Sequence, residues 1–202
     1  MSDSACYDLP LLFKKKLGSG EKLMLNIGCG TDYKDDWINI DNNSDNNIEK
    51  LDLNWDLRCA LPFPDNSVDF IYNEHFLEHL TVEEGIRAVK DFMRILKPNG
   101  ILRIAMPDLK NTVAMYLDPN WESDPVIKKF GLEYIKTKAE MINTNFRAWG
   151  HKWLYDAEEL QRRLREAGCV NMKLCQLRQS DHEKLKNLET RDESTLVMEI
   201  RK

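Results

Sequence analysis

The chain has 202 residues, of which 42% are hydrophobic and 31% charged, and 29 Lys and Arg against 34 Asp and Glu give a net charge of −5. This composition is typical of a globular protein, and at this length one domain is the default. The acidic balance disfavours a protein whose main task is to grip nucleic-acid phosphates, because such proteins usually carry a basic face. We therefore do not expect nucleic acid to be its partner.

The cysteines are odd in number, and none of their spacings matches a zinc ribbon or a redox CxxC pair. They are Cys6, Cys29, Cys59, Cys169 and Cys175. We interpret them as free thiols in a reducing compartment. The apolar run 9–13 is followed by lysines, the wrong order for a secretory signal, and no run approaches the roughly 20 apolar residues that span a bilayer. These observations predict a cytoplasmic protein without a membrane span.

Apolar runs alternate along the chain with segments of helical period, a pattern typical of an α/β fold with a mostly parallel sheet. Strands are predicted at 23–27, 37–40, 48–53, 68–72, 101–106, 170–177 and 195–200. A helix is predicted over 81–96, where Thr81 and Glu84 have capping-box spacing. A second begins at Asp156, three residues before Glu159, and ends near Gly168. No repeat or linker interrupts residues 1–202, so we expect a single domain.

The first predicted strand runs into Gly28-Cys29-Gly30, a turn whose exposed backbone N–H groups suit a ligand that approaches closely. A dinucleotide fingerprint would require glycine at position 33, where the chain has Tyr33, and an acid about 20 residues further on. Asp41 instead follows Gly30 by only eleven residues. No Gly-Lys-Ser/Thr follows the turn, so a phosphate loop is excluded as well. Taken alone, the Gly28-Cys29-Gly30 segment is equally consistent with an ordinary tight turn that binds no ligand.

The order of motifs is more specific than any one of them. The segments LNIGCG, WINID, LDL, LPFPDNSVDFIYNEHFLEHL and RILKPNGILRIAMPD follow one another in that sequence. This series resembles the class I S-adenosylmethionine-dependent methyltransferases, particularly their type-11-like branch. The resemblance covers about residues 21–108 and returns at HKWLYDAEELQRRLREAGC. It implies a doubly wound α/β fold with a mostly parallel seven-stranded sheet whose last strand is inserted antiparallel.

The resemblance also implies S-adenosylmethionine as the cofactor and assigns roles to residues at the ends of the first four strands. Gly28 and Gly30 would pass close under the methionine part, Asn26 would stand where many relatives have an acid, and Asp41 would accept from the ribose hydroxyls. The remaining expected contacts are Asp52 and Leu53 with the adenine, and Asn73 beside the methionine and the reacting methyl group.

Two departures qualify this comparison. Few residues separate Gly30 from Ile38, so the helix that usually joins the first two strands is reduced to a turn or lost. After the fourth strand, Asn73-Glu74-His75-Phe76 is not the Asn-Pro-Pro-aromatic motif of enzymes that methylate planar amino groups. The second departure again disfavours nucleic acid as the methyl acceptor.

Residues 108–155 follow a strand end that faces the expected cofactor, so we expect a helical insertion on the acceptor side. Trp149, His151, Trp153 and Tyr155 alternate within it, as a buried strand edge or as the lining of an acceptor pocket. His151 is the first hypothesis for a general base and His75 the second, because imidazole titrates near neutrality. Nothing in the sequence requires a metal.

We therefore expect methyl transfer from S-adenosylmethionine to a hydroxyl of a small-molecule or glycan-like acceptor. Two alternatives stay open. One is a nucleotide-binding Rossmann enzyme, which Tyr33 and the position of Asp41 disfavour. The other is a cofactor-binding pseudoenzyme or assembly subunit that keeps the fold without turnover.

Overall fold

The computed structural model describes residues 11–42, 48–129 and 131–202. Its strands are β1 (Met24–Ile27), β2 (Ile38–Asp41), β3 (Leu53–Asn54), β4 (Val68–Glu74), β5 (Leu96–Met106), β6 (Asn171–Cys175) and β7 (Leu196–Arg201). Its α-helices are α1 (Leu11–Ser19), α2 (Val82–Ile95), α3 (Leu109–Leu117), α4 (Pro125–Lys129), α5 (Lys138–Arg147) and α6 (Ala157–Glu166). Four 3₁₀ turns join them in the described part: η1 (Leu77–His79), η2 (Trp121–Ser123), η3 (Ala148–Gly150) and η4 (Glu183–Leu185).

The strands form one seven-stranded sheet in the order β3-β2-β1-β4-β5-β7-β6. The first five strands pair in parallel, whereas β7 is antiparallel to both β5 and β6. This confirms the predicted sheet and its inserted last strand. The carboxyl ends of β1, β2 and β4 consequently lie at one edge, where open α/β sheets bind their ligands.

The third strand is shorter than the predicted segment 48–53, because its ladder with β2 begins only at Leu53. Just before it, the backbone N–H of Asp52 donates to the Asn39 carbonyl, and the Asp52 carboxylate accepts from the Asn39 backbone N–H at 2.8 Å. A side chain that hydrogen-bonds the neighbouring backbone competes with strand pairing. The edge strand is therefore reduced to two residues.

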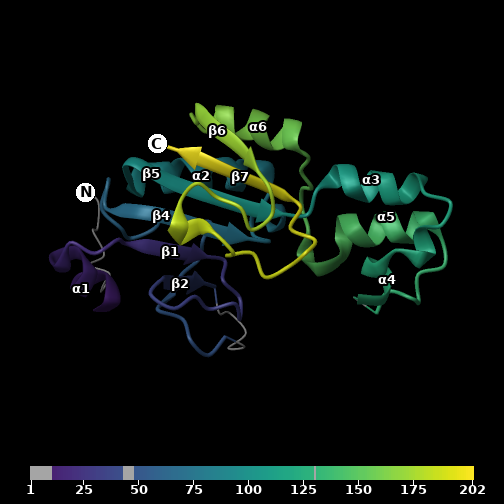
Figure 1. Ribbon diagram of the computed structural model, residues 1–202, viewed down its shortest axis with the longest axis horizontal. Helices are drawn as coiled ribbons and strands as arrows, with labels where there is room; N and C mark the ends of the chain where they lie inside the picture. Colours follow the sequence, from purple (N-terminus) through teal and green to yellow (C-terminus); the bar gives the residue numbers. More distant parts are fainter. Residues whose placement is uncertain (1–10, 43–47, 130) are drawn as a thin grey trace.

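Different structures cover the two faces of the sheet (Figure 1). One face packs against α2 and α6, and its core includes Phe92 of α2 and Leu160 of α6. The opposite face packs against the segment between β6 and β7, which buries Leu185 against Tyr72 and Val197. Because β1 and β2 are joined by a turn, this connecting segment takes the place that a crossover helix would occupy.

A buried ion triad anchors the connecting segment to the sheet. Arg103 of β5 is fully buried, and its guanidinium lies 2.6 Å from carboxylate oxygens of both Glu189 and Glu199. Burial opposes the charge of Arg103, but the hydrogen bonds from these two carboxylates outweigh it and raise its pKa. The Arg103 guanidinium also donates to the Gln179 carbonyl. Both ends of the segment are thus fixed to one strand.

Both predicted helix starts are capped as expected. Thr81 and Glu84 form the complete capping box of α2, each side chain bonding the other's backbone N–H. Asp156 accepts from the Glu159 backbone N–H at 2.9 Å to begin α6. Gly168, with φ of +93°, follows the end of that helix in the left-handed conformation.

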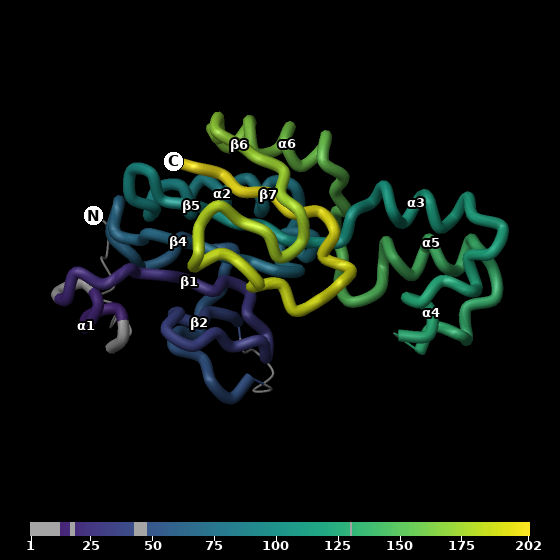
Figure 2. The backbone as a smooth tube through the Cα atoms, in the orientation of Figure 1, coloured from purple at the N-terminus to yellow at the C-terminus, as the bar shows by residue number. Residues whose placement is uncertain are grey.

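The segment 108–155 stands beside the sheet as a group of helices, α3 to α5 (Figures 1 and 2). It has a small core of its own, formed by Met115, Trp121, Ile127, Leu132, Ile135 and Met141. Its two ends meet, because the Leu109 N–H donates to the Tyr155 carbonyl at 2.8 Å. The insertion therefore leaves the sheet and returns to it at one point.

Two further predictions concern thiols and membranes. Cys29, Cys59, Cys169 and Cys175 are free, as predicted, and Cys6 lies outside the described residues. Within the described part of the chain, no helix has the length and apolar character needed to cross a bilayer.

Candidate functional site

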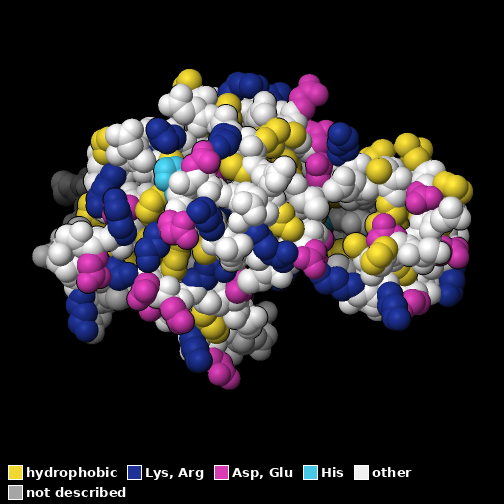
Figure 3. Space-filling model, viewed as in Figure 1, with side chains coloured by type: hydrophobic (Ala, Val, Ile, Leu, Met, Phe, Trp, Pro, Cys, Tyr) yellow, Lys and Arg dark blue, Asp and Glu magenta, His cyan; other side chains and the backbone are white. Residues whose placement is uncertain are grey.

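A cavity of about 680 Å³ opens at the carboxyl edge of the sheet, between the strand ends and the insertion. This volume lies in the range of pockets that hold cofactors and small ligands. Figure 3 shows from one side the hollow between the body of the molecule and the helical insertion. The sheet side includes Asn26, Gly28, Cys29, Gly30, Asp41, Glu74 and His75, and the insertion side includes Met115, Ile127, Leu132, Met141, Asn145, Trp149 and His151.

The glycine turn after β1 is fixed by backbone hydrogen bonds to β2. The N–H groups of Gly28 and Cys29 both donate to the Ile40 carbonyl, at 2.9 and 3.3 Å. Gly28 has φ of +67° and lies so close to Phe76 that an added Cβ would meet its side chain at 2.8–3.0 Å. Gly30 has φ of +51° and open space at the same position. One glycine is thus required by packing, and the other leaves room for a ligand.

Asn26 holds the short connection between β1 and β2. Its Nδ2 donates to the Asp32 carbonyl at 2.8 Å and to Asn39 Oδ1 at 3.0 Å. The same Oδ1 accepts from the Lys34 backbone N–H. This network of amides stabilises a turn where a helix is usual, so the geometry around Gly30 survives the shortened connection.

Asp41 ends β2 on the cavity wall. Its Oδ2 accepts from the Gly30 N–H at 2.7 Å, and its Oδ1 accepts from the Asn42 N–H at 2.6 Å. The carboxylate is therefore oriented by the glycine turn itself. Each oxygen has a further lone pair that can accept from a ligand hydroxyl.

The cavity wall beyond Asp41 differs from the one predicted. Asp52 and Leu53 are not among its lining residues, and the Asp52 carboxylate is bonded to both nitrogens of Asn39. Asp56 and Leu57 line this part instead, together with Arg58. Hydrogen bonds from Arg58 lower the pKa of the Asp56 carboxyl to about 2.

Asn73 is fully buried in β4 and is likewise absent from the cavity wall. Its amide oxygen and nitrogen have no hydrogen-bond partner among the described residues. The next two residues, Glu74 and His75, face the cavity in its place. His75 reaches the wall with φ of +52°, a turn in the backbone at the strand end.

Glu74 attaches the connecting segment between β6 and β7 to this edge. Its carboxylate accepts from Ser194 Oγ at 2.6 Å, from the Thr190 N–H and hydroxyl at 3.1 and 2.9 Å, and from the Arg191 N–H at 3.2 Å. Burial favours the neutral acid, but these hydrogen bonds outweigh it and lower the pKa of Glu74. Figure 2 shows the segment crossing in front of the sheet.

Through this attachment, Thr190, Arg191 and Glu193 reach the cavity wall. In the sequence these residues lie in a polar stretch between two predicted strands, and polar residues in a loop look the same whether they face solvent or a ligand. Their one sequence signal is the carboxylate of Glu74 at a strand end, which needs donors if it is buried.

The aromatic residues of the insertion divide into two groups. Trp149 is 55% exposed and lines the cavity beside His151, with 5.6 Å between the ring centroids. Trp153 instead donates from Nε1 to Glu159, and Tyr155 is buried in the main core. Of the two alternatives that the sequence leaves open for this segment, pocket lining applies to Trp149, whereas Trp153 turns onto α6 and Tyr155 is buried beside Gly85 of α2.

The sequence pattern that defines the methyltransferase domain family matches residues 29–104. A demethylmenaquinone methyltransferase of Staphylococcus aureus is 25% identical over 158 residues, which are 72% of this chain and 58% of the relative. An uncharacterised protein of Haemophilus influenzae is 41% identical over 54 residues, 27% of this chain and 22% of that one. The chain thus spans from a fifth to somewhat over half of these relatives.

Solved structures agree with the fold. An S-adenosylmethionine-dependent methyltransferase from Archaeoglobus fulgidus superposes with a TM-score of 0.53 at 16% identity, covering 96% of this chain and 95% of its own. A Thermotoga maritima structure, described as a possible histamine N-methyltransferase, gives 0.52 at 19% identity, with 96% and 88% covered. The chain carries a methyltransferase domain at residues 29–104 and has the fold of S-adenosylmethionine-dependent methyltransferases. This methyltransferase assignment makes S-adenosylmethionine the cofactor against which the cavity is to be tested.

The cavity residues fit that cofactor. Gly30 leaves open space over the turn, and Asp41 offers carboxylate lone pairs at the end of the second strand. Leu57 adds an apolar surface on the same wall. Together they can accept a polar chain, a diol and a flat ring, the three parts of S-adenosylmethionine.

Proposed function

We propose that this methyltransferase transfers a methyl group from S-adenosylmethionine to a hydroxyl of a small-molecule or glycan-like acceptor. The observation that carries the proposal is the continuity of one cavity from the Gly28–Gly30 turn to the helical insertion. The relative named demethylmenaquinone methyltransferase supports an acceptor of small-molecule size. The insertion residues 108–155 then form the acceptor side.

Each residue on the sheet side has a defined task in this proposal. The glycine turn lies under the methionine part, Asp41 binds the ribose hydroxyls, and Asp56 with Leu57 flanks the adenine. Asn26 acts by holding the turn in place. Asn73 is fully buried in β4, behind this wall, and has no direct contact with the cofactor in this proposal.

S-adenosylmethionine supplies a methyl group already activated on a sulfonium, so the carbon–sulfur bond breaks as a carbon–oxygen bond forms and the acceptor hydroxyl loses its proton. The protein therefore has to align the acceptor and provide a path for that proton. Trp149 offers a partly exposed ring on which a sugar or another flat face can stack. His75, His79 and His151 are the imidazoles on the cavity wall.

The first experiment is a thermal unfolding series with added ligands. S-adenosylhomocysteine should raise the melting temperature, because a ligand that binds only the folded state stabilises it. NAD should leave it unchanged. A shift with NAD and none with S-adenosylhomocysteine would support the Rossmann-enzyme alternative instead.

A second experiment separates an enzyme from a pseudoenzyme. Methylation of a panel of glycans and small hydroxylated metabolites is measured with radiolabelled S-adenosylmethionine. Trp149→Ala should raise the KM for a working acceptor, whereas Trp153→Ala should not, because Trp153 packs on α6. Cofactor binding without turnover on any acceptor would favour the pseudoenzyme.

A further inference from the structure

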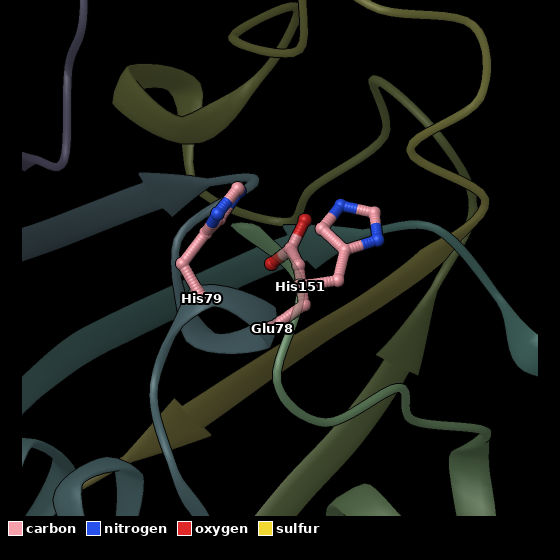
Figure 4. Close-up of side chains that lie close together, drawn as sticks. All are labelled: Glu78, His79 and His151. Carbon is pink, nitrogen blue, oxygen red and sulfur yellow. The ribbon is translucent and has the colours of Figure 1, made fainter. Parts of the chain in front are cut away.

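Three of the four histidines of the chain gather around one buried carboxylate at the cavity edge. Glu78 and His79 belong to the 3₁₀ turn after β4, and His151 belongs to the end of the insertion. One ligand atom from each of these three residues lies within 4.8 Å of the others. Figure 4 shows the Glu78 carboxylate between the two imidazole rings. His75 adds a third ring, with Nδ1 at 3.2 Å from Glu78 Oε1.

The backbone brings these distant residues together. The N–H groups of Lys152 and Trp153 both donate to the Glu78 carbonyl, at 2.7 and 3.2 Å. This double hydrogen bond fixes the chain after His151 against the turn that carries Glu78 and His79. The cluster is therefore a built feature of the fold and does not depend on the orientation of long surface side chains.

The hydrogen bonds of His151 leave one ring nitrogen ready to bind a cation. Its Nδ1 lies 2.7 Å from the Asn145 carbonyl oxygen, which can only accept, so Nδ1 carries the proton. The lone pair of the neutral ring is then on Nε2. Metal-binding histidines are commonly held in this way, with the second nitrogen donating to a carbonyl.

The same reasoning fixes the ring of His75. Ser194 Oγ donates its proton to the ionised Glu74 carboxylate, so it must accept from His75 Nε2, which lies 3.0 Å away. The lone pair of neutral His75 is consequently on Nδ1. That lone pair faces an oxygen of Glu78, and a metal ion or a proton between these two acceptors would join them.

The burial of Glu78 is an independent observation in favour of a cation at this cluster. Its side chain is 1% exposed, and neither carboxylate oxygen has a hydrogen-bond partner in the described part of the chain. Among the described residues Glu78 has no ion pair with lysine or arginine, and the one basic side chain within ion-pair distance of it is His75. A buried carboxylate without compensation is costly, so such groups are normally paired or bound to a metal.

We propose that Glu78, His79 and His151, with His75 as a fourth ligand, bind a divalent first-row transition-metal ion. Imidazole nitrogen with carboxylate oxygen is a ligand set for Zn²⁺, Mn²⁺, Fe²⁺ or Co²⁺, whereas Mg²⁺ and Ca²⁺ prefer oxygen ligands. This assignment replaces the expectation from sequence that no metal is involved. It also changes the role of His151 and His75 from general bases to ligands.

The site gives the cation a task that rests on the proposed function. The three imidazoles line the same cavity as the glycine turn and the insertion. A coordination position open to that cavity can take the oxygen of an acceptor hydroxyl, and a bound divalent ion makes such a hydroxyl far more acidic. Its proton can then pass to water, and a neutral imidazole base is not needed.

The test uses full-length protein freed of metal with a chelator and titrated with Co²⁺, whose visible absorption reports nitrogen and oxygen ligands directly. We expect saturation at one Co²⁺ per chain and displacement by Zn²⁺. Because loss of an outer-sphere partner alone costs about 10- to 100-fold in metal affinity, His151→Ala should lose at least about 100-fold. His182→Ala is the matched control, since this fourth histidine packs against Phe70 near the start of β4, whereas the cluster follows the end of that strand.

A second variant protects the test against misfolding. Glu78→Gln keeps the shape of the buried side chain and removes its charge, and circular dichroism checks the fold of each variant. If Glu78→Gln does not fold, the Co²⁺ affinity of the double variant His79→Ala/His151→Ala is measured instead, because these two side chains lie on the cavity wall. Absence of saturable Co²⁺ absorption in the wild type, or equal Co²⁺ affinity in the wild type and the His79→Ala/His151→Ala variant, overturns the metal site.

Calorimetry with S-adenosylhomocysteine separates this proposal from the proposed function. Binding of S-adenosylhomocysteine to a protein that does not bind Co²⁺ overturns only the metal site. Binding of Co²⁺ without S-adenosylhomocysteine leaves the metal site standing and overturns the cofactor role of the cavity.

Discussion

Replacing Gly28 with alanine tests whether the glycine turn is fixed by packing. An alanine Cβ at this position would lie 2.8 Å from Phe76 Cδ2 and 3.0 Å from Phe76 Cγ, and φ is +67°. The left-handed conformation costs an alanine about 1–2 kcal/mol. Inserting a methyl group into a filled core adds about 1–3 kcal/mol. Gly28→Ala should therefore lower the free energy of unfolding by about 2–5 kcal/mol.

Gly30→Ala is the matched control, since its φ of +51° imposes the same backbone cost but its Cβ meets nothing within 4 Å. It should cost only about 1–2 kcal/mol, while its methyl group weakens S-adenosylhomocysteine binding by projecting into the cavity. Both free energies come from urea denaturation followed by circular dichroism. Combining Gly28→Ala with Phe76→Ala should be less harmful than the sum of the single changes by about 1–3 kcal/mol. Equal losses for the two glycines, together with strict additivity for the pair, would refute the packing argument.

Three further predictions concern ionisable groups. Asp41→Ala should weaken S-adenosylhomocysteine binding about 10- to 150-fold, since a hydrogen bond to a charged group contributes about 1.5–3 kcal/mol. Asp52→Ala is the control, because Asp52 lies outside the cavity, and it should leave the affinity measured by calorimetry unchanged. Burial, followed by the charge of Asp41, raises the pKa of the Cys29 thiol to about 12, so iodoacetamide at pH 8 should label exposed Cys59 and spare Cys29 in peptide mass spectra until urea is added. The pKa of Glu74 lies below its ordinary value of 4.5, so its contribution to stability is present above pH 4.5 and is lost in more acid solution. The stability difference between wild type and Glu74→Gln should therefore shrink as the pH falls below 4.5, and a difference that grows would contradict the assigned hydrogen bonds.

The sheet could be predicted from the sequence because its signals are local. Apolar runs, the capping box at Thr81 and the glycine after α6 each depend on residues within one turn or strand. Asp41 could be placed for the same reason, since it ends a short apolar strand. The structure keeps it on the cavity wall through its bond to Gly30.

The remaining parts of the site depend on contacts between distant segments. Asp52 and Asp56 are alike as acids in a short polar stretch, and only the bond of Asp52 to Asn39 shows which one leaves the wall. Likewise, Glu78 and His79 could be read as surface groups of an early helical turn. Their meeting with His151 depends on backbone hydrogen bonds that span more than seventy residues.

The adjacency of the two chain ends of the insertion has a consequence for the evolution and engineering of this scaffold. Because the Leu109 N–H bonds the Tyr155 carbonyl, the two chain ends of the helical unit are already adjacent. A unit with its own core and neighbouring ends can be exchanged without moving the strands that carry Gly28 and Asp41. Its exchange would nevertheless remove His151. A replacement unit would therefore meet the same sheet side of the cavity, but it would have to supply the side chains that act on the acceptor.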